Sequence, residues 1–205
     1  HPKRWRFRLS PKSSGTTNAC MVSPDADTAL ILLAAGRSRR FGSDKLVAAF
    51  RGAPLWSWAA RAAEQAGFAH RYLVVGPHSA IAPRPGWQVV LNSRADEGMG
   101  TSIAAGVAQA RRHTRLVMIL ADMPLVEPAH LSLLANGEDP VFTQHDDGRP
   151  GAPAGFPRSA YPRLAKLAAN EGAGNLEWHD ADVIAPGSAS LRDIDRQEDL
   201  ELLQR

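Results

Sequence analysis

The chain has 205 residues, of which 44% are hydrophobic, so it can form one domain with a single substantial core. The formal net charge is +3, but five basic residues and no acidic ones fall in the first 20 positions. The remainder carries 19 basic against 21 acidic side chains, a formal charge of −2, which does not favour nucleic acid as a partner. No apolar run approaches the roughly 20 residues of a membrane-spanning helix, and there is no signal-peptide core. We therefore expect a soluble, cytoplasmic protein that binds neither nucleic acid nor membrane.

The basic start of the chain has a composition that is not typical of a folded core. It contains prolines, serines and few apolar side chains, and periodic apolar patterning begins only after Met21. We interpret residues 1–24 as a disordered or added leader ahead of one domain at residues 25–205, and we expect its removal to leave folding intact. The alternative is a basic anchor for an anionic partner. Cys20, the one cysteine, excludes an intrachain disulfide and a zinc cluster of several cysteines.

Short apolar runs alternate with helix-like stretches along the rest of the chain. The runs are aliphatic or β-branched and bounded by Gly, Pro, Asn or Asp, which predicts buried strands. They cover residues 30–33, 72–75, 89–91, 116–120 and 141–143. Apolar residues at three- and four-residue spacing predict helices at residues 55–66, 102–112, 128–134, 160–167 and 197–204. The alternation predicts a single three-layer α/β/α domain with a mostly parallel sheet, in which ligands bind beyond the carboxyl ends of the strands.

The loop after the first predicted strand gathers small residues and cations. Ala34, Ala35 and Gly36 let backbone N–H groups come close to a ligand, and successive N–H groups in a turn form a concave anion site. Four cationic side chains follow in the same loop, Arg37, Arg39, Arg40 and Lys45. Guanidinium and ammonium groups together suit a triphosphate, whereas the alternative is a solvated basic turn. Neither a Walker loop nor the Gly-x-Gly-x-x-Gly dinucleotide signature is present at this position.

This stretch resembles the signature Leu-Ala-Ala-Gly-x-Ser-x-Arg-x-Gly-x-x-Lys of nucleotidyltransferases, and in particular of the molybdenum cofactor cytidylyltransferases. Every fixed position from Leu33 to Lys45 matches. The resemblance implies a Rossmann-like, glycosyltransferase-A-like fold and a Mg²⁺-dependent transfer of a nucleoside monophosphate. It also implies that the backbone beside Leu33, from Ala34 to Gly36, binds the base and sugar. Arg40 would then face the β and γ phosphates, and Lys45 would face the α phosphate.

Residues 92–102 form a second loop suited to a ligand, because they follow the predicted strand at 89–91 and lead into a helix. Thr101 or Ser102 is suited to cap that helix, with exposed N–H groups behind it for an anion or a base edge. Similar proteins have a stretch here that contacts nucleotide and acceptor, which implies nucleotide-binding roles for Asn92, Gly98 and Ser102. The alternative is an ordinary glycine-containing loop with a helix cap.

Two carboxylates are candidates for a metal site. Asp122 follows the strand at 116–120, and a hard cation such as Mg²⁺ is bound by carboxylate oxygens together with phosphate oxygens and water. Family members have Gly-Asp-Met-Pro at this position, and their Asp binds the metal. Asp195 matches a second metal-binding carboxylate of the family, with Asp193 as the fallback. The alternatives are a turn cap at Asp122 and helix N-terminal acids at the other two positions.

The acceptor side matches the family only loosely. Residues 148–153 and 170–174 resemble the acceptor-binding patterns Gly-His-Pro and Gly-Asp-x-Gly-Ala-Arg of the cofactor enzymes. Ala152 replaces the His, Asn170 replaces the Asp and Gly174 replaces the Arg. None of the seven histidines forms a metal-ligand pair at helical or hairpin spacing. The reaction type is therefore better supported than the acceptor.

The resemblance implies CTP as donor, molybdopterin as acceptor, and a molybdoenzyme of the xanthine dehydrogenase type as recipient. Catalysis would rest on Lys45, Arg40 and Asp122. Alternatives are guanylyl transfer, a sugar or alditol phosphate as acceptor, and a cofactor-binding chaperone without turnover. The combination of Lys45, Asp122 and Asp195 favours an enzyme, because a binding protein has little need for two metal carboxylates.

Overall fold

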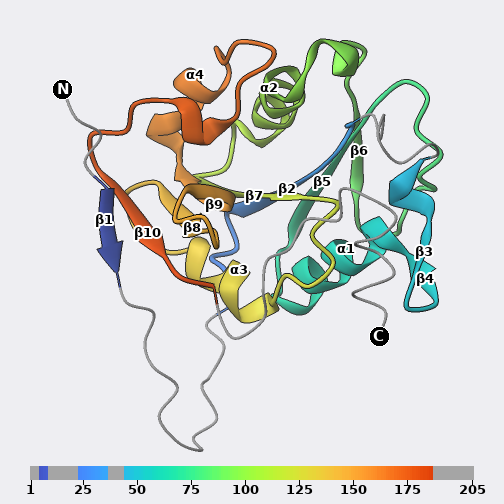
Figure 1. The fold of residues 1–205 in the computed structure, drawn as a ribbon, viewed down its shortest axis with the longest axis horizontal. Coiled ribbons are helices and arrows are strands. Elements are labelled where there is room, and N and C mark those ends of the chain that lie inside the picture. The colour runs from blue at the N-terminus through green and yellow to red at the C-terminus, as the bar shows by residue number, and fades with distance from the viewer. Residues whose placement is uncertain (1–4, 9–22, 37–43, 187–205) are drawn as a thin grey trace, which may run out of the picture.

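An eight-stranded sheet forms the centre of the protein. The computed structural model describes residues 5–8, 23–36 and 44–186. The strands follow the order β1-β10-β8-β9-β7-β2-β5-β6, and only β9 runs antiparallel to its neighbours (Figure 1). Their bounds are Trp5–Arg8 (β1), Thr28–Ala34 (β2), His70–Val75 (β5), Gln88–Leu91 (β6), Arg115–Leu120 (β7), Val141–Gln144 (β8), Pro150–Pro157 (β9) and Ala181–Ile184 (β10). The short strands β3 (Ala49–Phe50) and β4 (Ala53–Pro54) form a separate hairpin.

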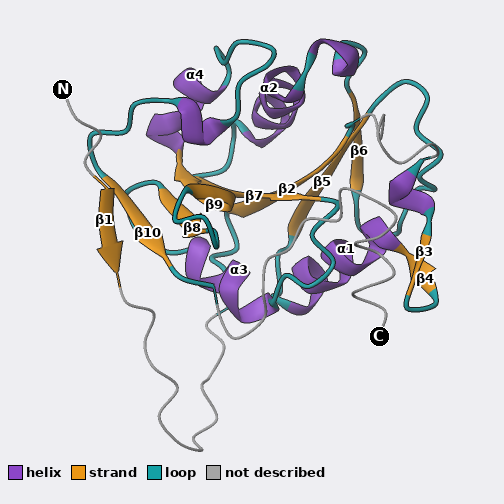
Figure 2. Ribbon diagram, in the orientation of Figure 1, coloured by secondary structure: helices purple, strands orange, loops and turns teal. Residues whose placement is uncertain are grey.

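Helices cover both faces of the sheet, which gives the predicted three layers (Figure 2). One face carries α1 (Leu55–Gln65) and α3 (Pro128–Leu134), and the other carries α2 (Met99–Ala110) and α4 (Tyr161–Leu164). Successive side chains of a strand point to opposite faces. In β2, Leu30 and Leu32 accordingly pack with α1 and α3, whereas Ile31 and Leu33 pack with α2 and α4.

Helix α2 lies unusually close to the sheet. A Cβ atom at Gly106 would stand 2.7 Å from Ile31 Cγ2 and 3.3 Å from Val74 Cγ2. A larger residue at this position would therefore push α2 away from the sheet. The close approach matters for function because the amino end of α2 lies at the carboxyl edge of the sheet, beside the site described below.

The predicted strands and the first three helices are present. Helix α3 spans the predicted residues, whereas the ends of the other elements are shifted. Helix α2 begins at Met99 rather than Ser102, and the stretch at 160–167 forms only the short α4 after a 3-10 turn, Arg158–Ala160. Strand β9 is not predicted, because its proline and glycine content is unfavourable in a strand. It is accommodated by a shift in register between Phe142 and Thr143 of β8. The helix predicted at 197–204 lies outside the described residues.

The prediction of a structureless leader needs correction for residues 5–8. These residues form β1, which pairs in parallel with β10 at the edge of the sheet. The Trp5 ring packs edge-on against Phe142, with ring centroids 5.1 Å apart. Arg6 pairs with Asp139 and with Asp182, the latter at 3.1 Å. Trp5 and Arg6 thus both have partners that lie far away in the sequence.

None of the helices in the described parts of the chain is long and apolar enough to cross a membrane.

We expect Trp5→Ala to lower the free energy of unfolding by about 2 kcal/mol, because it removes a partly buried aromatic contact. Phe7 lies in the same strand and is 61% exposed, so Phe7→Ala is the matched control and should change stability by less than about 0.5 kcal/mol. Urea denaturation of both variants measures the difference. Equal effects of the two substitutions would contradict a specific role for Trp5.

His130 links α3 to β8 and β9 and makes stability depend on pH. Thr143 Oγ1 donates to Pro153 O at 2.6 Å, so the neutral His130 donates through Nε2 to Thr143 Oγ1 at 2.7 Å. Burial lowers the pKa of His130 from 6.5 to about 4. The unfolded chain therefore binds a proton near pH 6.5 that the folded protein accepts only near pH 4, and stability is lost as the pH falls through this window.

For His130 we expect a loss of about 2 kcal/mol in the free energy of unfolding between about pH 7.5 and about pH 5. His130→Gln keeps a side-chain N–H for Thr143 without the titrating ring and should show a smaller loss. Urea denaturation at both pH values gives the comparison. The same pH dependence in both proteins would show that other groups are responsible.

Candidate active site

A pocket of about 420 Å³ lies at the carboxyl edge of the sheet. It is bounded by the loops that follow β2, β6 and β7 and by the amino end of α2. Its lining residues are Leu33, Ala35, Gly36, Lys45, Leu46, Ala95, Asp96, Gly98, Met99, Ser102, Leu120 and Asp122. The position is the one expected for a ligand in a mostly parallel sheet.

An ion pair between Lys45 and Asp122 forms the polar centre of this pocket. Lys45 Nζ lies 2.7 Å from Asp122 Oδ2, and the side chains are only 12% and 19% exposed. The other carboxylate oxygen, Asp122 Oδ1, is buried and has no hydrogen-bond partner among the described residues. An unpaired buried carboxylate oxygen is costly, so this atom needs a cation or a donor.

The backbone around the ion pair is held in place on both sides. Lys45 opens a 3-10 turn, Lys45–Val47, where Asp44 Oδ1 accepts from Leu46 N at 3.2 Å and Leu46 is buried. Asp122 follows Ala121, whose N–H donates to Leu33 O at 3.0 Å. The loop after β7 is thereby tied to the end of β2. These contacts set the backbone positions from which the side chains of Lys45 and Asp122 meet.

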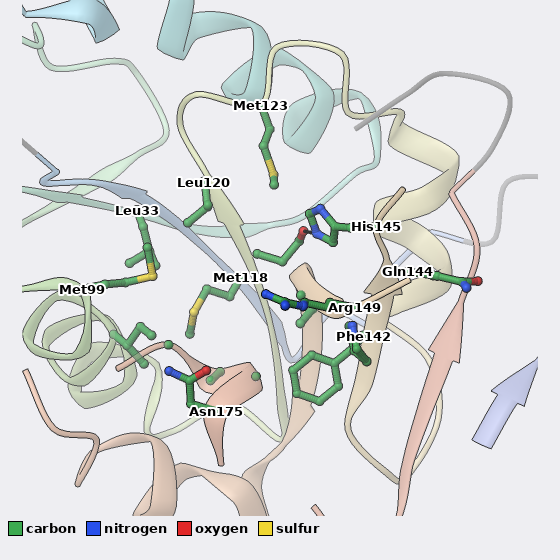
Figure 3. A pocket seen from close by; sticks show the side chains of 18 of the residues that line it. Leu33, Met99, Met118, Leu120, Met123, Phe142, Gln144, His145, Arg149 and Asn175 are labelled. Carbon is green, nitrogen blue, oxygen red and sulfur yellow. Dashed lines mark hydrogen bonds between the residues drawn. The ribbon is translucent and has the colours of Figure 1, made fainter. Parts of the chain in front are cut away.

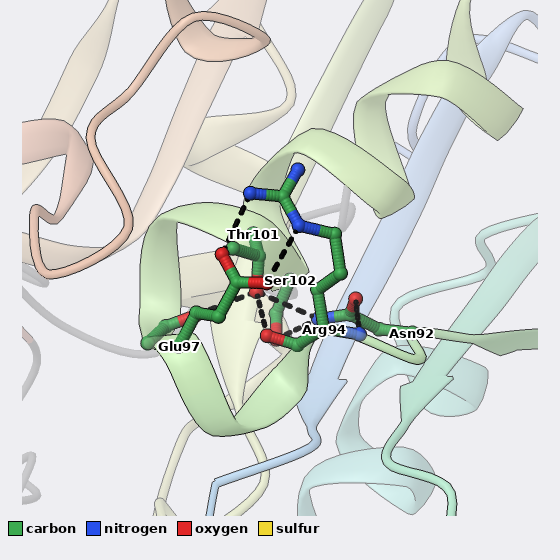
Figure 4. A network of polar contacts seen from close by, with 6 residues as sticks. Asn92, Arg94, Glu97, Thr101 and Ser102 are labelled. Carbon is green, nitrogen blue, oxygen red and sulfur yellow. Dashed lines mark hydrogen bonds and ion pairs between the residues drawn. The ribbon is translucent and has the colours of Figure 1, made fainter.

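Asn92 connects the loop after β6 to the first turn of α2 (Figure 4). Its amide nitrogen donates to Thr101 Oγ1 and to Ser102 Oγ, each at 2.9 Å, and its oxygen accepts from Arg94 N at 3.0 Å. The side chain is buried and is not among the residues that line the pocket. The hydrogen bonds of Asn92 therefore position the loop that borders the pocket.

The same loop carries an exposed ion pair. Arg94 donates to both carboxylate oxygens of Glu97, at 2.8 and 2.6 Å. The hydrogen bonds from Arg94 lower the pKa of Glu97, and the positive charge of Arg94 lowers it further. The pair therefore stays ionised at neutral pH. It fixes the shape of the turn that leads to Gly98.

The amino end of α2 is covered by a segment from the other side of the site. Gly98 has φ +137°, and a Cβ atom there would collide with the carbonyl oxygen of Ala169. Gly100 N donates to that oxygen at 2.9 Å. Because α2 begins at Met99, Ser102 lies in its first turn and does not cap it, which corrects the predicted cap.

A second pocket of about 510 Å³ adjoins the first and shares Leu33, Met99 and Leu120 with it (Figure 3). Its inner wall is apolar and includes three of the four methionines of the chain, Met99, Met118 and Met123. Phe142 and Phe156 complete this wall. The polar part of the lining comes mainly from β8, β9 and the turn between them, and from residues 172–175.

The loosely matched acceptor regions form one side of this second pocket. Arg149, Gly151, Ala152, Gly172 and Gly174 all line it. His145 also lines it, and its Nε2 lies 2.6 Å from Ala152 O.

His145 was missed in the sequence analysis although it directly follows β8. Asp122 is a candidate because it is a polar residue directly after a strand, and the same criterion applies to His145.

The structure brings together most of the predicted site residues. Seven of them line the first pocket: Leu33, Ala35, Gly36, Lys45, Gly98, Ser102 and Asp122. Ala34 ends β2 and is buried outside the lining, and Asn92 lies beneath the loop. Arg40, Asp193 and Asp195 lie outside the described residues. Within residues 5–8, 23–36 and 44–186, no group of three His, Cys, Asp or Glu side chains is placed to hold a metal.

Two known proteins resemble this chain over half of its length or more. The purine catabolism protein PucB of Bacillus subtilis is 27% identical over 194 residues, which cover 85% of this chain and 95% of PucB. A molybdenum cofactor guanylyltransferase of Xanthomonas euvesicatoria is 34% identical over 104 residues, about half of each chain.

A solved structure has a similar fold over most of this chain. Rv0371c of Mycobacterium tuberculosis superposes with a TM-score of 0.74 at 27% identity, covering 86% of this chain and 97% of Rv0371c. Another structure of Rv0371c is a complex with manganese, with a TM-score of 0.70 at 25% identity. The model of the MobA-like NTP transferase domain matches residues 30–183, so the chain belongs to this family of nucleotidyltransferases.

Proposed function

We propose that the protein transfers CMP from CTP to the phosphate of molybdopterin and releases pyrophosphate, with Mg²⁺ as cofactor. The observation that carries this proposal is the junction of two pockets beside Lys45 and Asp122. One pocket has the family signature for a nucleotide, and the other has a separate lining suited to an acceptor. Transfer between two bound substrates requires two such pockets to meet at the reacting atoms.

The residues present fit a divalent metal. Mg²⁺ is typically bound through one or two carboxylates together with substrate phosphates and water, so a full cage of protein ligands is not required. Asp122 supplies a buried carboxylate oxygen without a hydrogen-bond partner in the described part of the chain, and the resemblance adds Asp195. The manganese complex of Rv0371c supports a metal in a relative. When bound, the ion would offset charge on the phosphates.

The side chains of this chain would position and neutralise the reacting groups. An acceptor phosphate oxygen attacks the α phosphorus, the bond from this phosphorus to the bridging oxygen breaks, and pyrophosphate leaves with its electron pair. Lys45 and Arg40 would balance charge on the α phosphoryl group and on the leaving group. Because the acceptor is already an anionic phosphate, no strong general base is needed.

The lining of the second pocket favours a pterin over a sugar or alditol. Thioether and phenyl groups contact planar, polarisable rings favourably, and Met118 and Phe142 belong to this apolar wall. Sugar hydroxyls against the same wall would lose hydrogen bonds to water without replacement. The name of PucB places that relative in purine catabolism, and xanthine is a purine, which supports a recipient of the xanthine dehydrogenase type.

Guanylyl transfer is the second candidate, because the Xanthomonas relative is a guanylyltransferase. The experiment that tests the proposal measures pyrophosphate release with each of the four nucleoside triphosphates and Mg²⁺. Candidate acceptors are molybdopterin, a sugar phosphate and an alditol phosphate. We expect release only with molybdopterin, and fastest with CTP. Nucleotide binding without release for every acceptor would favour a chaperone.

In the same assay, Asp122→Asn should abolish metal-dependent turnover, and Lys45→Ala should lower turnover by roughly 10²–10³, the usual loss for one electrostatic stabiliser. Lys166 is exposed and lines neither pocket, so Lys166→Ala is the control and should keep the wild-type rate. Circular dichroism checks that each variant is folded. Wild-type rates in the Asp122 and Lys45 variants would remove the site assignment.

The choice of base should depend partly on Ala35, which lines the nucleotide pocket. Its methyl group takes space that a purine needs and restricts the loop backbone, so CTP should be preferred to GTP. One methyl group contributes only about 1–3 kcal/mol to the discrimination between two substrates, which is a ratio of roughly 10–200-fold in kcat/KM. Ala35→Gly should therefore raise the relative kcat/KM for GTP while CTP is still used. Equal or better use of GTP by the wild type would contradict cytidylyl transfer and leave nucleotidyl transfer intact.

A further inference from the structure

The ion pair at the centre of the site has a consequence for how metal and nucleotide enter. We infer that the Lys45 ammonium and a divalent cation compete for the Asp122 carboxylate, so that the metal is bound well only when the nucleotide is present. This inference rests on the proposed function, because it takes Asp122 as the metal ligand.

The Lys45 ammonium lies close enough to weaken the binding of a second cation by the Asp122 carboxylate. Lys45 Nζ lies 2.7 Å from Asp122 Oδ2, in a site where both side chains are largely shielded from water. A divalent cation on the same carboxylate would lie close to the ammonium group, and like charges at such distances repel strongly where the dielectric is low. Asp122 Oδ1 has no hydrogen-bond partner among the described residues and stays accessible to a metal, but the ammonium on Oδ2 weakens metal binding there.

Among the described residues, Asp122 does not belong to a group of three metal-ligating side chains. Phosphate oxygens of a bound triphosphate would supply further ligands to the metal and new partners to Lys45 at the same time. The long stem of Lys45 allows this exchange while the capped turn, Lys45–Val47, stays in place.

Competition of this kind couples two binding events. A triphosphate that draws Lys45 away from Asp122 strengthens metal binding, and by linkage the metal strengthens nucleotide binding by the same factor. The Lys45 ammonium also keeps Asp122 Oδ2 paired. In this proposal Lys45 exchanges its contact with Asp122 for a contact with the phosphates when the nucleotide binds.

The test is Mn²⁺ binding to the nucleotide-free protein, measured by calorimetry and by the shift in melting temperature. We expect Lys45→Met to bind Mn²⁺ at least tenfold more tightly than the wild type, because the competing charge is gone. Lys45→Arg keeps that charge and should bind as weakly as the wild type. Lys166→Met removes an exposed lysine and should keep the Mn²⁺ affinity within about twofold of the wild-type value, since exposed charges contribute little to the binding of a distant ion.

The double variant Lys45→Met with Asp122→Asn separates this inference from the proposed function. Return of Mn²⁺ affinity to the wild-type value shows that the gain arises at Asp122. A gain in Lys45→Met that persists in the double variant overturns both the inference and the metal assignment. Unchanged affinity in Lys45→Met overturns the inference alone, provided that Asp122→Asn still abolishes metal-dependent turnover. Lys45→Gln repeats the comparison if Lys45→Met does not fold.

Discussion

Parallel pairing of β2 with β5 on one side and β7 on the other determines where ligands can bind in this protein. The three strands run in register, so the chain leaves them at one edge of the sheet. Two hydrogen bonds extend this register beyond the strands, from Ala121 N to Leu33 O and from Asn92 N to Val75 O. The loops that contain Asp122 and Asn92 are consequently held at fixed positions relative to the loop that contains Gly36.

Buried aliphatic strands were predictable because each is a short continuous apolar run with a turn signal at either end. Strand β9 was not, since its sequence is rich in proline and glycine and is stabilised by partners on both sides. Strand β1 was not predictable either, because basic residues such as Arg6 and Arg8 are typical of a solvated tail. Only the carboxylates of Asp139 and Asp182, far along the chain, show that a basic side chain can belong at this edge.

The site was predictable where its chemistry lies in one stretch of sequence, as in the loop that ends at Lys45. The contact of Lys45 with Asp122 was not, because 77 positions separate the two residues and only the folded sheet brings them together. Judged by residue type alone, the side-chain amide of Asn92 can hydrogen-bond either to a ligand or to its own loop. Burial, which the sequence does not give, decides that it positions the loop.

The hydrogen bond from Gly100 N to Ala169 O ties the amino end of α2 to the segment ahead of Gly172 through the main chain alone. A main-chain oxygen is present whatever the side chain, so the segment around Ala169 can change in sequence and still hold the amino end of α2. Three residues further along, Gly172 begins the stretch 172–175 that lines the second pocket, so this main-chain contact also sets where that stretch starts. A side chain larger than hydrogen at Gly98 would meet the carbonyl oxygen of Ala169 and push the segment away from the helix.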